Sequence, residues 1–338
     1  MHKGRTLAKL TGLVGLLALP LMTSGATVSR ACWLRDAVSP TPTVVYGLCE
    51  QGRLYTTKDA GATWTTSETG AEVSLRALTF IDAAHGLIVG DRGTILASDD
   101  AGKTWQARKS GTTNHLLTVV SVGNDVWAGG YDGILLHSAD AGKTWEQQKT
   151  PSGLAIESIF FLDAAHGWAV GWAGTILRTA DGGKKWEAIE TSAASWSLNG
   201  VYFKDLKVGW VVGFQGQLMR SDDGGTTWKA QPPKDAKGQP IRVWLKGITS
   251  DSSNRIWVAA DDQLLMSADG QTWTAKPTET LLFLGDFVHV GDSLWAIGQL
   301  GALKLSGTGT DWKPVDSLVV GGSTKDVLTT AVKPEGSN

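Results

Sequence analysis

The sequence predicts an all-β fold, a seven-bladed β-propeller of four-stranded antiparallel blades, on three observations. Seven tryptophans recur at intervals of 39 to 45 residues. They close copies of a short motif, Ser/Thr-x-Asp-x-Gly-x-Thr-Trp in its clearest form, which we call the Asp box. Each period holds four short strand-like runs, and a repeat of about 40 residues with four strands is typical of a propeller. The boxes end at Trp64, Trp105, Trp145, Trp186, Trp228, Trp273 and Trp312.

Residues 1–26 are expected to be a secretory signal peptide that lies outside the fold. A basic start precedes an uncharged apolar run, Leu10–Met22, and the small residues Ser24–Ala26 follow it. The apolar run is too short to span a bilayer. We therefore expect an exported protein, with an uncleaved membrane tether as the alternative.

The sequence has two cysteines, Cys32 and Cys49, and an exported chain is expected to join them in a disulfide. If residues 39–42 form the turn of a hairpin, the two cysteines face each other. A lipid-modified Cys32 is the alternative. The preceding Ser29-Arg30-Ala31 fits the small, apolar approach of bacterial lipoproteins poorly, which favours the disulfide.

One period, residues 75–108, shows the expected blade. Strand A covers residues 75–81, strand B 86–90 and strand C 94–98, and strand D begins at residue 104. Large residues in strand B are predicted to pack between blades, because an indole buries much apolar area. These are Leu87, Trp127, Trp168, Trp210 and Trp295.

The Asp box is interpreted as scaffolding. Its Ser or Thr and its Asp are expected to bond to their own turn, and its Gly accepts left-handed geometry. The last copies are degenerate, since Ser267–Trp273 is one residue short and residues 306–312 lack the Asp.

One propeller domain is expected over residues 27–332, with a frayed tail at 333–338. Strand A of the first blade is supplied either by residues 29–36 or by residues 326–332. The predicted disulfide favours the first alternative.

The B–C and D–A connections of a propeller emerge on one face, opposite the Asp boxes. Aromatic residues and Arg in these connections predict a partner-binding rim, because both contribute much contact energy per residue. Packing of loop against blade is the alternative for each tryptophan. The candidate residues are Arg76, Arg92, Tyr131, Trp172, Trp196, Phe214, Arg242 and Trp244.

No metal, cofactor or nucleic acid is expected. His85 and His166 occupy matching Asp-Ala-Ala-His-Gly turns and are interpreted as structural, and no Cys/His/Asp cluster has ligand spacing. The net charge of −2 argues against a general polyanion binder. A monomer is expected, and peripheral association with a membrane is left open.

The boxes resemble the Asp-box or bacterial-neuraminidase repeats of sialidases, some xyloglucan-active glycoside hydrolases and sortilin-type receptors. A wider pattern, from Phe160-Phe-Leu-Asp through His166-Gly-Trp168 to Trp186, resembles the photosystem II stability/assembly factor family. That resemblance covers roughly residues 40–315. It implies an exported, non-enzymatic propeller in the periplasm, or in the thylakoid lumen of a photosynthetic organism.

Thylakoid members of that family hold a reaction-centre precursor through an arginine-rich patch. Arg76 and Arg242 match in part, but the strand-start positions of other blades read Leu116, Glu157, Asn199 and Leu284. A continuous arginine track is therefore absent. The resemblance implies a scaffold or assembly factor for a membrane or envelope protein complex, or for its precursor subunit. Photosynthetic and non-photosynthetic bacterial homologues are both left open as alternatives.

A glycoside hydrolase or glycan-binding propeller of the sialidase type is the alternative function. Asp91, Asp132 and Glu157 are the carboxylates that could serve a top-face cleft. The Arg-Ile-Pro stretch of sialidases is missing, so we expect no catalysis.

Overall fold

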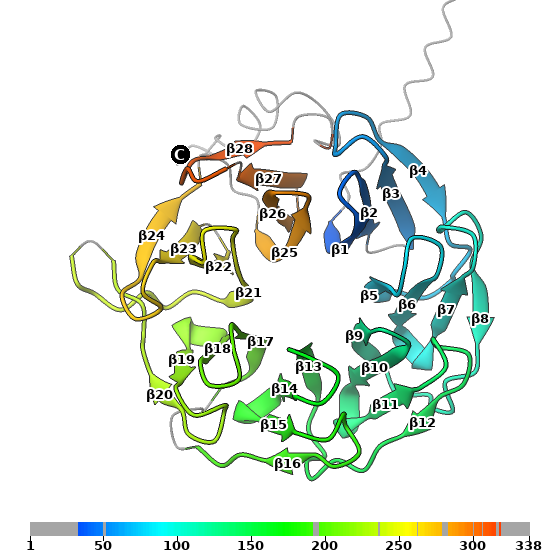
Figure 1. The fold of residues 1–338 in the computed structure, drawn as a ribbon, viewed down its shortest axis with the longest axis horizontal. Coiled ribbons are helices and arrows are strands. Elements are labelled where there is room, and N and C mark those ends of the chain that lie inside the picture. Colours follow the sequence, from blue (N-terminus) through cyan, green and yellow to red (C-terminus); the bar gives the residue numbers. More distant parts are fainter. Residues whose placement is uncertain are drawn as a thin grey trace, which may run out of the picture.

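Seven four-stranded antiparallel sheets stand in a closed ring, which confirms the predicted fold class (Figure 1). Within each sheet the strands are neighbours in chain order. The computed structural model describes residues 33–49, 52–191, 196–235, 237–261, 263–278, 283–299, 301–305, 307–315 and 318.

The first four blades follow the sequence from the N-terminal side. Blade 1 contains β1 (Leu34–Thr41), β2 (Val44–Cys49), β3 (Arg53–Thr57) and β4 (Thr65–Glu68). Blade 2 contains β5 (Leu75–Phe80), β6 (Gly86–Gly90), β7 (Ile95–Ser98) and β8 (Gln106–Arg108). Blade 3 contains β9 (Leu116–Val122), β10 (Asp125–Gly130), β11 (Leu135–Ser138) and β12 (Glu146–Gln147). Blade 4 contains β13 (Ile156–Phe161), β14 (Gly167–Gly171), β15 (Ile176–Thr179) and β16 (Glu187–Ala188).

The remaining three blades complete the ring. Blade 5 contains β17 (Leu198–Phe203), β18 (Gly209–Gly213), β19 (Leu218–Ser221) and β20 (Lys229–Ala230). Blade 6 contains β21 (Leu245–Ser250), β22 (Ile256–Ala260), β23 (Gln263–Ser267) and β24 (Thr274–Pro277). Blade 7 contains β25 (Leu284–Val290), β26 (Ser293–Gly298), β27 (Gly301–Leu305) and β28 (Trp312–Pro314).

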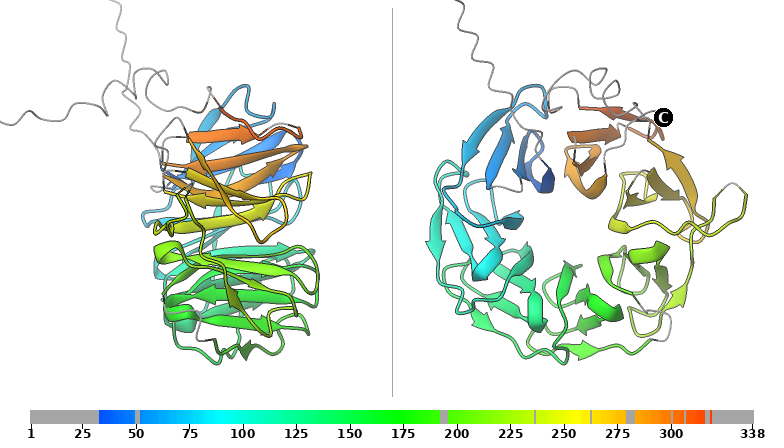
Figure 2. Two further views of the ribbon diagram at one scale, coloured as in Figure 1. Left: turned by 90° about the vertical axis from the view of Figure 1, so that its left-hand side faces the viewer. Right: turned by 180° about the vertical axis from the view of Figure 1, so that it is seen from behind.

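The order of the strands gives the disc two different faces. The left view of Figure 2 shows the disc from its edge. Strand A of each blade lines the centre and strand D forms the rim (Figure 1). Because the strands alternate in direction, the A–B and C–D turns lie on one face, which we call the Asp-box face. The D–A and B–C connections lie on the other, which we call the B–C face.

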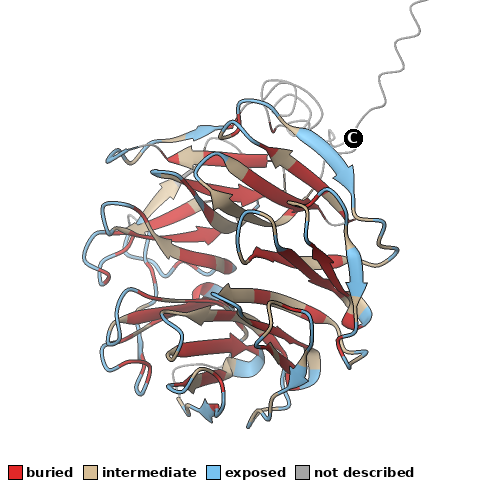
Figure 3. Cartoon of the chain, turned by 45° about the vertical axis from the view of Figure 1, so that its right-hand side comes forward, coloured by how far each residue is buried: buried red, intermediate tan, exposed pale blue. Residues whose placement is uncertain are grey.

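The burial of a strand depends on its position in the blade (Figure 3). Strands β6, β14, β18 and β22 are buried along their whole length, whereas the rim strands β4, β12, β16 and β20 are exposed. The central strands therefore read as continuous apolar runs, since both of their faces meet a neighbouring blade.

The large strand-B residues pack between blades, as predicted. Trp168 stacks on Phe203 of blade 5, with ring centroids 3.6 Å apart, and its Nε1 donates to the Gly224 carbonyl at 3.1 Å. A Cβ placed on Gly225 would lie 2.6 Å from the same indole, so the Asp-box glycine makes room for it. Trp257 holds this position in blade 6 and was missed, because that blade lacks the glycine pair used to align the repeats.

The Asp-box turns have the predicted internal bonds. In blade 2, Asp100 Oδ1 accepts from the backbone NH of Thr104 at 2.9 Å and Oδ2 accepts from its hydroxyl at 2.7 Å. Ser98 Oγ donates to Asp100 and accepts from the NH of Gly102 at 2.8 Å. The hydrogen bonds from Thr104 lower the pKa of Asp100 to about 2. The box is therefore structural.

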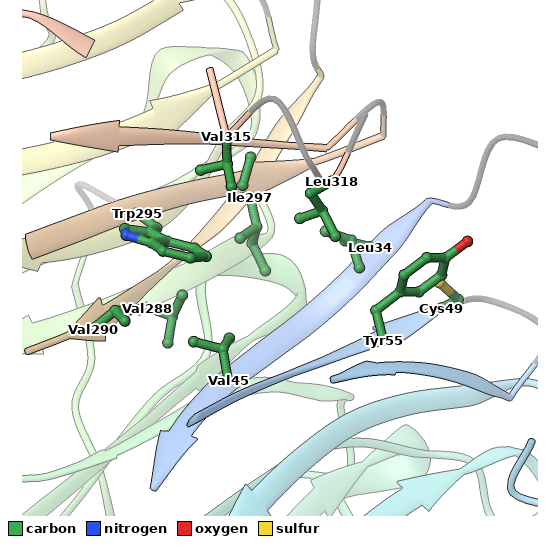
Figure 4. Close-up of a cluster of buried hydrophobic side chains, with 11 residues drawn as sticks. Leu34, Val45, Cys49, Tyr55, Val288, Val290, Trp295, Ile297, Val315 and Leu318 are labelled. Carbon is green, nitrogen blue, oxygen red and sulfur yellow. The ribbon is translucent and has the colours of Figure 1, made fainter. Parts of the chain in front are cut away.

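The ring closes where blade 7 meets blade 1 (Figure 4). β1 supplies strand A of blade 1, so this strand comes from the N-terminal side and runs five residues further than the predicted 29–36. Trp295 of β26 packs on Gly61, where a Cβ would lie 2.5 Å from the ring. The closure thus repeats the Trp-on-glycine contact that Trp127, Trp168 and Trp210 make in blades 3, 4 and 5.

The expected hairpin turn at residues 39–42 is wrong in register. β1 continues to Thr41, which pairs with Val44, so Pro42 and Thr43 form the turn. Cys49 is consequently opposite Leu34. Cys49 is disulfide-bonded, but Cys32 lies outside the described residues, so the Cys32–Cys49 pairing stays a prediction.

Several other expectations also fall outside the described residues. These are the signal peptide at 1–26, the alternative closing segment at 326–332 and the tail at 333–338. Within the described part of the chain, no helix has the length and apolar character needed to cross a membrane.

Candidate partner-binding face

The exposed large hydrophobic side chains gather on one face. Among the described residues there are seven, from 36% exposed at Phe214 to 52% at Trp196. Six lie in D–A or B–C connections and therefore on the B–C face. Only Leu206, in the A–B turn of blade 5, lies on the Asp-box face. The six are Leu154, Trp172, Trp196, Phe214, Trp244 and Phe283.

The B–C turns present side chains on this face because of their backbone. The turns Asp91–Gly93, Tyr131–Gly133, Trp172–Gly174 and Phe214–Gly216 share one geometry. Their second and third residues have positive φ, for example 57° at Arg92 and 69° at Gly93, as in the type I′ turn of a tight hairpin. The first residue of each turn is the one whose side chain contacts the neighbouring connection.

A chain of contacts joins blades 2, 3 and 4 on this face. Arg76 binds Asp91 through two hydrogen bonds of 2.8 and 3.2 Å, and His115 Nδ1 lies 2.9 Å from the same carboxylate. His115 packs against Tyr131, and Tyr131 against Trp172, with ring centroids 5.4 Å apart in both pairs. Arg76, predicted as a binding residue, is therefore already paired within the chain.

Trp172 is held by Glu157, one of the three carboxylates that could serve a top-face cleft. Its Nε1 donates to Glu157 Oε1 at 2.6 Å. Burial raises the pKa of Glu157, while the Trp172 hydrogen bond and the charge of Arg76 oppose this. Burial also raises the pKa of Asp91, but its bonds to Arg76 and His115 outweigh this and leave the pKa lowered. Both carboxyl groups are thus engaged in orienting neighbouring side chains.

A second group, which we call the aromatic triad, joins blades 5 and 6. It consists of Trp196, Phe214 and Trp244. Phe214 lies edge-to-face with both tryptophans, with centroids 5.8 Å from Trp196 and 5.9 Å from Trp244. Trp244 Nε1 donates to Asn199 Oδ1 at 2.8 Å.

The triad lies between two hollows. An inner hollow of about 390 Å³ lies at the centre of the ring and is lined by Trp244, Asn199 and strand-A residues of blades 1, 4, 5, 6 and 7. An outer hollow of about 280 Å³ is lined by Trp196, Pro232, Pro240, Ile241 and the blade 5 turn. Arg242 borders the outer hollow, and its side chain is exposed.

The structure therefore brings together most of the predicted rim residues. Tyr131 contacts Trp172, and Phe214 contacts both Trp196 and Trp244. Arg92 is exposed at its turn, away from these contacts. Leu154 and Phe283 were not predicted, because each precedes a strand A whose first apolar residues look like ordinary core in the sequence.

The family of the chain follows from a family model. The model described as photosynthesis system II assembly factor YCF48 matches residues 56–154 and 186–290, more than half of the chain. The chain belongs to this family.

Solved structures show the same fold as this YCF48-family chain. One described as YCF48 bound to D1 peptide is 21% identical, with a TM-score of 0.58, and covers 72% of this chain and 82% of that one. The GH74 enzyme of Niastella koreensis is 18% identical, with a TM-score of 0.67, and covers 85% of this chain but 54% of that enzyme. The WD40 propeller of Doa1 is 9% identical, with a TM-score of 0.66, and covers 82% and 94%. Comparison with curated protein sequences gives no match.

Two of the strand-A positions that were compared with Arg76 in the sequence are corrected by the structure. The registers of all seven blades align the second residue of each strand A, so the residues equivalent to Arg76 in blades 3 and 7 are Leu117 and Gly285, not Leu116 and Leu284. Blades 1 and 6 contribute cations at this position that were not predicted. The seven residues are Arg35, Arg76, Leu117, Glu157, Asn199, Lys246 and Gly285.

These cations interact with groups of the chain itself. Lys246 Nζ lies 2.9 Å from Asp261 and 5.2 Å from the centre of the Trp244 ring. The Arg35 guanidinium lies 4.7 Å over the ring of Trp33. In this YCF48-family member the basic residues at the centre of the B–C face are thus interspersed with aromatic rings and acids.

No group of three or more His, Cys, Asp or Glu side chains in the described residues could hold a metal ion. His85 and His166 bind the aspartate of their own turn, with Nδ1 at 2.8 Å from Asp82 and 2.9 Å from Asp163. This agrees with the structural role expected for both.

Proposed function

We propose that this chain is a non-catalytic propeller that binds a membrane or envelope protein, or its precursor subunit, and holds it during assembly. The proposal rests on the placement of six of the seven exposed large hydrophobic side chains of the described residues on the B–C face. Exposed aromatic clusters of this kind are typical of protein-binding surfaces. Membership of an assembly-factor family and the D1 peptide bound to the solved YCF48 support a protein partner.

The site geometry favours binding over hydrolysis. Glu157 accepts a hydrogen bond from Trp172 and Asp91 is bonded by Arg76, so both carboxyl groups are used within the face. The likeness to GH74 enzymes is one of fold. Hydrolysis of an aryl glycoside by the wild type that disappears in Asp132→Asn would overturn this part of the proposal.

The place of action is proposed to be the periplasm, or the thylakoid lumen in a photosynthetic organism. The basic and apolar start of the sequence and the disulfide bond of Cys49 support export. Mass spectrometry of the protein isolated from its host should find an N-terminus near residue 27 and no lipid on Cys32. An intact N-terminus in a cytoplasmic fraction would contradict export.

The test of function is affinity capture from a detergent extract of host membranes, with residues 27–338 as bait. We expect the wild type to retain a defined membrane or envelope protein. Trp172→Ala and Phe214→Ala should each reduce its recovery to about a tenth, because central aromatic residues dominate such interfaces.

Leu206→Ala is the control, since Leu206 is at least as exposed as Trp172 and Phe214 but lies on the opposite face. It should capture the partner as the wild type does. Equal losses in all three variants, or losses that follow a fall in melting temperature, would contradict a binding role for the B–C face.

A further inference from the structure

We infer that the aromatic triad binds an extended, uncharged segment of the client with apolar side chains at alternate positions. This inference rests on the proposed function and names the chemistry of the partner segment. It starts from the two hollows on either side of Trp196, Phe214 and Trp244.

The dimensions of the triad suit an extended chain. Its two centroid distances, 5.8 and 5.9 Å, span at most about 12 Å, which an extended chain crosses in three to four residues. Side chains at alternate positions of such a chain point to the same side. A segment crossing the triad can therefore place one apolar side chain toward the inner hollow, beside Trp244, and another toward the outer hollow, beside Pro232 and Ile241.

The charges around the triad are mostly engaged within the chain, which favours an uncharged segment, although the exposed side chain of Arg242 also borders the outer hollow. Lys246 is paired with Asp261 at 2.9 Å and lies over the Trp244 ring. Further along the face, Arg76 is paired with Asp91. A charged client would have to compete with these internal partners, whereas an apolar client leaves them in place. Binding at the triad should accordingly depend little on salt.

The hydrogen bonds of the triad argue against a sugar ligand. A sugar needs an open ring face flanked by polar groups that can bond to its hydroxyls. Here Trp244 Nε1 and Asn199 Oδ1 already bond to each other, and Phe214 meets each tryptophan edge-to-face instead of leaving a flat platform. Apolar side chains make no such demand for hydrogen bonds.

The tryptophan rings of this face are also held by contacts within the chain, which argues against their insertion into a bilayer. The Trp244 indole is fixed by Asn199 and covered on one side by Lys246. On the same face Trp172 is fixed by the partly buried acid Glu157. An interfacial tryptophan that enters a membrane has to leave such contacts, whereas a peptide is able to lie across them.

The test uses a defined probe, a seven-residue biotinylated peptide that alternates threonine with leucine and phenylalanine and has blocked ends. Its control has the same composition with the apolar residues contiguous. Biolayer interferometry should show that the wild type binds the alternating peptide about tenfold more tightly than the control. Trp196→Ala and Trp244→Ala should each weaken binding by about tenfold or more, because these side chains border the hollows.

Two controls keep the result interpretable. Leu206→Ala should bind like the wild type, and Trp244→Phe, which keeps the ring but loses the Asn199 bond, should retain most of the affinity. Raising the salt from about 0.05 to about 0.5 M should change the dissociation constant less than about twofold.

The inference is overturned if the wild type does not distinguish the two peptides, or if the triad variants bind like the wild type. It is also overturned if the wild type sediments with phosphatidylcholine vesicles or binds a glycan array and the triad variants do not. If membrane-protein capture persists in Trp196→Ala and Trp244→Ala but is lost in Trp172→Ala, the proposed function stands and this inference fails. A wild type that captures no membrane protein contradicts the proposed function instead.

Discussion

Trp168 and Trp172 lie four positions apart in blade 4 and have different surroundings. Trp168 is 1% exposed, stacked on Phe203 and bonded to the Gly224 carbonyl. Trp172 is 44% exposed and bonded only at its edge, to Glu157. The repeat accounts for the first, because a large residue recurs at that position in every blade. At the position of Trp172 the residue differs between blades, since blades 2, 3 and 5 have Asp91, Tyr131 and Phe214 there.

We predict opposite consequences for alanine at these two positions. Trp168→Ala should lower the free energy of unfolding by about 3–5 kcal/mol, because it opens a cavity between blades 4 and 5. Trp172→Ala should change it by less than about 1 kcal/mol, the loss of one exposed hydrogen bond. Denaturant unfolding of both variants checks this. A loss for Trp172→Ala as large as that for Trp168→Ala would mean that the aromatic rim is part of the scaffold.

At the scale of the element, the Asp box explains how a rim strand with little buried area stays in place. In blade 2, strand β8 is largely exposed, so the turn before it needs its own bonds. Asp100 supplies them by accepting from both the NH and the hydroxyl of Thr104. Its neighbour Asp99 is 64% exposed and reaches Arg108 only at 3.4 Å.

These two aspartates form a matched pair for a stability test. Asp100→Ala should lower the melting temperature by about 2–4 °C, and Asp99→Ala should leave it nearly unchanged. Because the folded-state pKa of Asp100 is lowered to about 2, its contribution is present above pH 4 and is lost as pH falls toward 2. The difference between the two variants should therefore shrink between pH 4 and pH 2. A difference that persists at pH 2 would show that Asp100 acts through packing.

How much of an element the sequence predicts depends on whether the element repeats. The strands and Asp boxes repeat, so their spacing predicts them, and even degenerate copies such as Ser267–Trp273 are placed correctly. The register of the first hairpin was wrong because β1 contains two bulges, between Leu34 and Asp36 and between Val38 and Thr41. The shift next to Leu34 recurs at the start of strand A in the other blades, whereas the shift before Thr41 is confined to this hairpin and therefore leaves no periodic signal.

The candidate site is predictable only in part for a related reason. The B–C turns follow a fixed pattern, so Tyr131, Trp172 and Phe214 were recognised. The D–A connections vary in length, and Leu154 and Phe283 escaped notice there. The pairing of Arg76 with Asp91 and of Lys246 with Asp261 arises only when the blade folds, so the sequence could not show that these cations are engaged.

At the scale of the whole molecule, the closure of the ring contains two partly buried aspartates. Asp36 of β1 and Asp286 of β25 lie in the inner strands of the first and last blades. Burial raises the pKa of Asp36 to about 8, the charge of Asp286 adds to this, and burial raises the pKa of Asp286 to about 6. Asp36 still accepts hydrogen bonds from the NH groups of Ala37 and Leu78, at 2.7 and 2.8 Å.

This pair predicts a propeller that loses stability as pH rises. A raised folded-state pKa means that the folded chain binds more protons than the unfolded chain, for which the aspartate pKa is about 4. The stabilising contribution is complete below pH 4 and is lost progressively up to pH 8. Asp36→Asn should remove most of this dependence and be more stable than the wild type at pH 8, by up to a few kcal/mol. If the free energy of unfolding changes by the same amount between pH 5 and pH 8 in the wild type and in Asp36→Asn, a protonated Asp36 at the ring closure is contradicted.

The two faces of the disc divide its tasks, one with repeated turns that stabilise the blades and the other with side chains that differ from blade to blade. The most direct test is site-specific photo-crosslinking in the native host, with a benzophenone amino acid in place of Phe214 on one face or of Leu206 on the other. We predict that position 214 forms a discrete adduct with a membrane or envelope protein and that position 206 does not. Adducts of equal yield at both positions, or an adduct at 206 alone, would contradict the assignment of the B–C face as the binding surface.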